Sequence, residues 1–182
     1  MGPFEYLWLT VFFFFILIAF VRGYHRELGA TTLIFVALFL ITYFAVPKLP
    51  TIINKLYRET FHISLSQRSI EHIMASGLSV IFIAIIFASY AGDTFAFKGK
   101  PTKGFTGFLY NLLVGAMNGY LVAGALWYFQ DYFHYPVTDF HILQLPLTTT
   151  GEHIANFLPP YVVPPIFWAV LVGVMLIFRV RK

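Results

Sequence analysis

Histidine and carboxylate side chains gather between residues 130 and 160, and these residue types bind divalent metal ions. The candidates are Asp131, His134, His141 and His153. Asp131 and His134 lie three residues apart, so a continuing helix would place both on one face. The stretch contains no recognised zinc motif such as H-E-x-x-H. A metal site and a set of polar surface residues remain as alternatives, and the prediction is that no metal or cofactor is bound.

Other site chemistries have less support in the sequence. Haem and pigment ligands are histidines within or at the end of a membrane span, and His72, at the start of an apolar segment, comes nearest to that position. The chain has no cysteine, which excludes disulfides, thiol catalysis and cysteine-ligated clusters. Neither a nucleophile elbow nor a nucleic-acid-binding motif is present. The protein is therefore predicted not to be an enzyme and not to bind nucleic acid.

Two asparagines interrupt the long uncharged run that begins at Gly104, and they share a helical face with small residues. Asn111, Gly115 and Asn118 lie nearly in line on a helix, because seven residues make about two turns. Gly115 and Gly119 form a G-x-x-x-G pair, and Ala123 extends the row. Such residues permit close helix approach and hydrogen bonding between helices. We interpret this segment as the helix on which the others pack, with a solute path as the alternative role of the asparagines.

The amino-acid composition indicates that the candidate residues above are carried by membrane-spanning helices. Hydrophobic residues make up 59% of the 182-residue chain and charged residues 11%, whereas a soluble domain carries about 25% charge. The mean hydropathy is +0.76. These values predict one all-α integral membrane domain over residues 1–182. Apolar segments long enough for five transmembrane helices cover about residues 4–21, 28–46, 72–91, 107–129 and 161–178.

The connections differ in character. Residues 22–27 form a short polar turn, so the first two spans make a hairpin. Pro47 and Pro50 are expected to end the second span. Residues 47–71 are amphipathic and predict a helix lying in the membrane interface, or alternatively a loop helix packed on the end of the bundle. Residues 130–160 form the loop on the outer side.

Small residues also recur in the third span. Gly77, Ala84 and Ala91 are seven residues apart, which predicts a row able to meet the Gly115/Gly119 face.

Basic residues set the expected orientation. With the N-terminus outside and the C-terminus in the cytoplasm, eight of the twelve Lys and Arg residues fall on the inner side. Arg22 and Arg26 are then topology determinants at the membrane boundary, or alternatively a site for anionic lipid headgroups. A cleaved signal peptide is the alternative to a first span, but the residues before the apolar run include Glu5 and no Lys or Arg, so a basic n-region is missing.

Two stretches resemble the CvpA family, the colicin V production proteins. They are Arg22 to Leu28 (RGYHREL) and Asn111 to Leu121 (NLLVGAMNGYL). The resemblance implies a small protein of the bacterial inner membrane, tied to colicin export and envelope physiology, without established catalytic residues. It also implies four spans, so that the fifth is an extension.

These observations predict a non-catalytic scaffold or accessory subunit of a larger membrane complex, such as a photosynthetic or respiratory one. Its partners would be the lipid bilayer and other integral membrane proteins or copies of itself, bound through packing residues Gly77, Ala84, Asn111, Gly115, Asn118, Gly119 and Ala123. The alternative is a small transporter or channel involved in export or envelope homeostasis.

Overall fold

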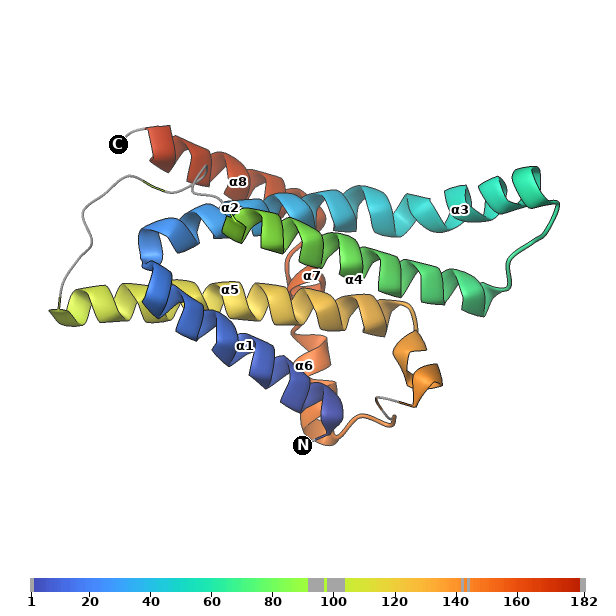
Figure 1. Ribbon diagram of the computed structural model, residues 1–182, viewed down its shortest axis with the longest axis horizontal. Helices are drawn as coiled ribbons and strands as arrows, with labels where there is room; N and C mark the ends of the chain where they lie inside the picture. The colour runs from blue at the N-terminus through green and yellow to red at the C-terminus, as the bar shows by residue number, and fades with distance from the viewer. Residues whose placement is uncertain (1, 92–96, 98–103, 142, 144, 181–182) are drawn as a thin grey trace.

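The computed structural model describes residues 2–91, 97, 104–141, 143 and 145–180, and every element in these ranges is helical. The expected all-helical architecture is therefore confirmed. Four helices are long and apolar enough to cross a membrane (Figure 1). They are α1 (Pro3–Arg22), the continuous helix Tyr24–Phe61, α4 (Gln67–Ala91) and α5 (Gly104–Tyr132).

α5 lies at the centre of the bundle. It contacts α1, the helix that follows α1, and α4, and in Figure 1 α1 crosses it on the side away from α4. In its most apolar stretch 67% of the residues are buried, compared with 28% in α1 and 33% in α4. α1 and α4 thus expose most of their apolar surface on the outside of the bundle, whereas the helix Tyr24–Phe61, 56% buried, and α5 expose less.

α1 and α2 (Tyr24–Leu40) form a hairpin with a single residue between them. That residue is Gly23, whose φ of 83° lies in the region that residues with a side chain rarely adopt. Pro3 begins α1, where its missing N–H would have no helical partner. The turn is tighter than expected and brings the ends of the two helices directly together.

The helix that begins at Tyr24 does not end at Pro47 and Pro50. A π-helical turn, η1 (Ile41–Ala45), follows α2 and leads straight into α3 (Val46–Phe61). In η1 the Val46 N–H donates to the Ile41 carbonyl, five residues back. Because a proline ring clashes with the carbonyl four residues earlier, a widened turn just before the prolines lets the helix continue. The expected break is thus replaced by a local change of helical pitch.

α3 accounts for the helical part of the amphipathic segment and continues roughly along the direction of α2 (Figure 1). It exposes Ile52, Leu56 and Phe61. The chain reverses after His62, and α4 begins at Gln67, five residues before the predicted start of the span. The Ser66 hydroxyl accepts a hydrogen bond from the Ser69 N–H and caps this helix.

The stretch expected as an outer loop folds back onto the bundle. It contains η2 (Pro136–Phe140), α6 (Thr149–Asn156) and α7 (Pro159–Val162). Gly124 of α5 packs against the ring of Pro159, eight residues and therefore about 12 Å before the end of α5. The segment after α5 thus folds back along this helix and contacts it about two turns before its C-terminal end.

The fifth apolar segment is interrupted between α7 and α8 (Pro165–Val180). The 16 residues of α8 extend about 24 Å, less than the hydrocarbon thickness of about 30 Å. Trp168 is buried and stacks on Phe35, which fixes α8 against α2. The predicted continuous span over residues 161–178 is therefore a shorter helix preceded by a bend at Val163 and Pro164.

Candidate functional site

Gly115 and Gly119 of α5 form the surface against which α1 packs. A Cβ atom added to Gly115 would lie 2.7 Å from the Cβ of Ala19, and one added to Gly119 would lie 2.6 Å from the carbonyl oxygen of Phe12. Both distances are far below van der Waals contact, so the absence of side chains is what lets the two backbones approach. Ala123, the next member of the row, is buried.

The small residues of α4 face elsewhere. No described atom lies within 4 Å of a Cβ added to Gly77, and Ala84 is exposed. The predicted contact between this row and the Gly115/Gly119 face is therefore wrong. α4 instead buries Leu78, Phe82 and Ile86, which make more van der Waals contacts in the core than glycine and alanine would. The small-residue row points outward.

A polar cluster lies between the α1–α2 hairpin, α4 and α5, with Glu27 at its centre. Glu27 is fully buried. Its carboxylate accepts hydrogen bonds from the Tyr90 hydroxyl at 2.6 Å, from Nδ2 of Asn118 at 3.0 Å and from Nη1 of Arg22 at 3.2 Å. Three donors, one of them positively charged, stabilise a carboxylate that would otherwise be very costly to bury.

Both asparagines predicted as packing residues bind the α1–α2 hairpin. Oδ1 of Asn118 accepts a hydrogen bond from the Thr31 hydroxyl at 2.6 Å, while its amide group donates to Glu27. Oδ1 of Asn111 accepts the backbone N–H of Tyr24 at 2.8 Å, which provides a partner for a free helix-start donor. Residues 22–28 and 111–121, far apart in the sequence, thus contact each other directly.

Arg22 points into the protein, although it had been expected at the membrane boundary. Its guanidinium carbon lies 4.4 Å from the centroid of the Tyr90 ring, and its side chain is 17% exposed. Arg26, by contrast, is exposed. Glu27 lies in the predicted polar turn, and Tyr90 was not among the predicted site residues. The sequence feature that could have indicated the buried ion pair is an acidic residue, Glu27, close to Arg22 and Arg26 at the edge of an apolar segment.

The predicted metal candidates are not brought together. Asp131 accepts hydrogen bonds from the hydroxyls of Tyr135 and Tyr161, both at 2.6 Å. His134 pairs with Glu71, with 3.1 Å between Nδ1 and Oε1. His141 and His153 are exposed. Among the residues that the structure describes, no group of three or more His, Asp or Glu side chains is arranged to hold a metal ion.

A second polar cluster joins η2 to the start of α4. Arg68 donates two hydrogen bonds to Asp139, from Nε at 2.7 Å and from Nη2 at 2.6 Å. His72, considered above as a pigment ligand, lies 2.8 Å from the same carboxylate, and Arg68 also pairs with Glu71 at 3.1 Å. The hydrogen bonds from Arg68 and His72 lower the pKa of Asp139 below its ordinary value.

This cluster has a testable pH dependence. We expect Asp139→Asn to lower the unfolding temperature at pH 7, by at most about 2–4 °C because the pair is partly exposed. A pKa lower in the folded than in the unfolded protein gives a stabilisation that is present above the ordinary pKa of 3.8 and is lost as pH falls through the folded value. The difference from wild type should therefore shrink below about pH 4. Thermal unfolding from pH 7 down to about pH 2 measures it, with Glu152→Gln as the matched control. A difference that does not shrink at all below pH 4 would contradict the assignment.

The fold and this site define a class: a helical bundle whose four long apolar helices suit a multi-pass membrane protein, with a buried ion pair at its first hairpin. Comparison with protein-family models, curated proteins and solved structures finds no match to this chain.

Proposed function

We propose that this chain is a CvpA-like, non-catalytic protein of the bacterial cytoplasmic membrane that acts as a scaffold or accessory subunit in a larger membrane complex. The observation that carries the proposal is the outward row on α4. Gly77, Ala84, Ala88 and Ala91 lie on one helical face, and the last three are exposed. Small residues on a lipid-facing helix allow close approach of a helix from another chain.

The contact between the two CvpA-like stretches supports the family part of the proposal. Arg22 and Glu27 in the first stretch and Asn118 in the second belong to one hydrogen-bonded cluster. Gly115 and Gly119 place α1 beside them. Residues that carry the resemblance therefore form one structural unit around the first hairpin.

The distribution of charge supports an inner C-terminus and an outer N-terminus. The α1–α2 turn, with Arg22 and Arg26, and the end of α8, with Arg179, lie at the same end of the bundle (Figure 1). Cytoplasmic segments are enriched in such residues. The remaining inner-side residues of the prediction, Lys98, Lys100, Lys103, Arg181 and Lys182, lie outside the described residues.

The scaffold role predicts a specific loss of assembly. Ala84→Leu adds a bulky side chain to the outward row without touching the core, so the complex extracted from native membrane should shrink or dissociate on a native gel while the protein itself remains folded. Thr10→Leu, a small-to-large change on the exposed side of α1, is the matched control and should leave the complex intact. An unchanged complex in Ala84→Leu would contradict the proposed interface.

A transporter is the second candidate, because the structure buries an ionisable carboxylate beside the midpoint of α5. Ionisable groups inside membrane bundles often mark solute or proton paths. Against this, hydrogen bonds to Arg22, Tyr90 and Thr31 hold Glu27 and Asn118 in place between three helices, which favours a structural role. Solute flux into proteoliposomes of the purified protein, abolished by Glu27→Gln, would favour transport over the scaffold.

A further inference from the structure

Two adjacent cavities follow the crevice between α1 and α4, and residues of α5 line both. The first, the head cavity, has a volume of about 190 Å³ and lies near the α5 end that leads into η2. The second, the tail groove, has a volume of about 360 Å³ and extends toward Tyr90. Val11 and Leu126 line both, so the two cavities are adjacent.

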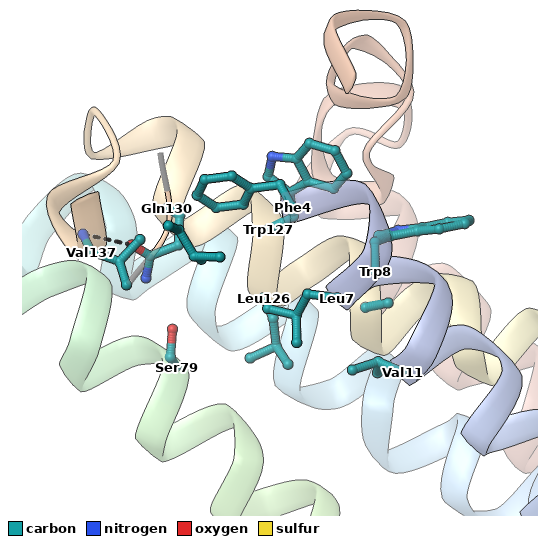
Figure 2. A pocket seen from close by; sticks show the side chains of 11 residues that line it. Phe4, Leu7, Trp8, Val11, Ser79, Leu126, Trp127, Gln130 and Val137 are labelled. Atoms are coloured by element: carbon teal, nitrogen blue, oxygen red, sulfur yellow. Dashed lines mark hydrogen bonds between the residues drawn. The ribbon is translucent and has the colours of Figure 1, made fainter. Parts of the chain in front are cut away.

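The head cavity has aromatic walls and two polar groups. Phe4, Trp8 and Trp127 line it, together with Ser79 of α4 and Gln130 of α5 (Figure 2). Oε1 of Gln130 accepts the Val137 N–H at 3.3 Å, and within the described part of the chain its amino group makes no hydrogen bond. The Ser79 hydroxyl donates to the Ala75 carbonyl at 2.7 Å, which leaves its oxygen able to accept. The cavity therefore offers both a donor and an acceptor.

The tail groove is lined by apolar and aromatic side chains alone. Phe14 and Phe87 stand at its mouth and are 58% and 73% exposed, so the groove is open to the membrane. The Tyr90 hydroxyl is turned away to Glu27, and its ring closes the far end. A hydrocarbon chain matches this lining, because it needs no hydrogen-bond partner.

The lining also restricts the head of the occupant. Among the described residues around both cavities none is charged, so a phosphate or carboxylate would be buried without a counter-charge. Arg22, behind Tyr90, is already paired with Glu27. A dry cavity of about 150 Å³ is known to hold a benzene-sized molecule, so the head cavity has room for one small head. An α-helix, about 10 Å wide with its side chains, is too thick to enter it.

We propose that this crevice binds a single membrane lipid with a small uncharged, oxygen-bearing head and a long hydrocarbon tail. The head lies between Ser79 and Gln130, where a carbonyl or hydroxyl oxygen accepts from the Gln130 amide and a hydroxyl donates to Ser79. The tail runs along the groove between α1 and α4. A monoacylglycerol can make both hydrogen bonds, whereas an alkylated benzoquinone has only carbonyl oxygens and can make the bond to Gln130 alone.

Tryptophan fluorescence gives a direct test, because two of the three tryptophans line the head cavity. The protein carrying Trp168→Phe, which leaves Trp8 and Trp127 as emitters, is placed in phosphatidylcholine nanodiscs. It is titrated with a bromine-labelled long-chain monoacylglycerol and, separately, with a decyl benzoquinone. Saturable quenching by either probe is expected, and which one saturates at lower mole fraction identifies the source of the ligand.

Variants localise the binding. Ser79→Leu fills the head cavity and should weaken binding about tenfold, the scale of one lost hydrogen bond plus steric exclusion. Ser76→Leu, the same change at an exposed residue that does not line the cavity, should bind as wild type. Gln130→Leu removes the amide donor, should weaken binding several-fold, and carries the test if Ser79→Leu does not fold.

Three results would overturn the proposal. Quenching that rises without saturation and equally in all variants would mean contact with bulk lipid only. Saturation by bromine-labelled phosphatidylglycerol but not by the neutral probes would mean an anionic lipid held near Arg22. Full wild-type affinity in both folded Ser79→Leu and folded Gln130→Leu would place the ligand elsewhere.

Discussion

Gly119→Ala is expected to destabilise the protein by about 1–3 kcal/mol, the usual cost of forcing atoms into a close-packed contact. The new methyl group would lie 2.6 Å from the Phe12 carbonyl oxygen and 3.1 Å from its Cα, both backbone atoms that no side-chain rotation can move aside. α1 would have to shift away from α5 and lose its contacts along the whole row. Thermal unfolding of the purified protein in detergent measures the loss, and Gly119→Leu should lose more.

Gly77→Ala is the matched control for that experiment. It makes the same change in another span, at a position where no described atom lies within 4 Å of the added Cβ. Alanine favours a helix over glycine by up to about 1 kcal/mol, so the control should be neutral or slightly stabilising. Equal changes in stability in the two variants would mean that the contact with Phe12 has no effect of its own, and this would refute the close-approach argument.

Glu27→Leu is expected to have the second large effect, a loss of about 3–5 kcal/mol. The substitution leaves the Tyr90 hydroxyl, the Asn118 amide and the Arg22 guanidinium without their common acceptor. Each unsatisfied buried donor costs about 1–3 kcal/mol. Glu27→Gln keeps an acceptor oxygen and should lose less. The measurement is again thermal unfolding, with secondary structure checked by circular dichroism.

A double-mutant cycle with Arg22 separates the ion pair from the other contacts. Arg22→Leu alone leaves a fully buried carboxylate without its cationic partner and should be strongly destabilising. In the double variant Arg22→Leu/Glu27→Leu no charge remains, so the combined loss should be smaller than the sum of the single losses. Strict additivity would mean that the two side chains do not interact in the folded protein.

Much of the helical framework follows from the sequence. Apolar segments of 18 residues or more predict membrane-length helices because their composition leaves lipid as the favourable solvent. The Arg22–Glu27 stretch predicts the first hairpin, since a glycine between two apolar runs permits a sharp reversal. The helix boundaries near Pro47 and Pro50 were not predictable in this way, because local geometry in η1 absorbs the proline clash.

Gly115 and Glu27 illustrate which features the sequence predicts and which depend on tertiary packing. The sequence by itself determined that the protein is helical and apolar, that α5 carries a row permitting close approach, and that its asparagines need partners. Only the tertiary structure decided that α1 occupies that row, that the α4 row faces outward, and that Glu27 is a buried acceptor. Periodicity specifies which residues share a face of one helix, whereas the partner of that face depends on how all the helices pack at once.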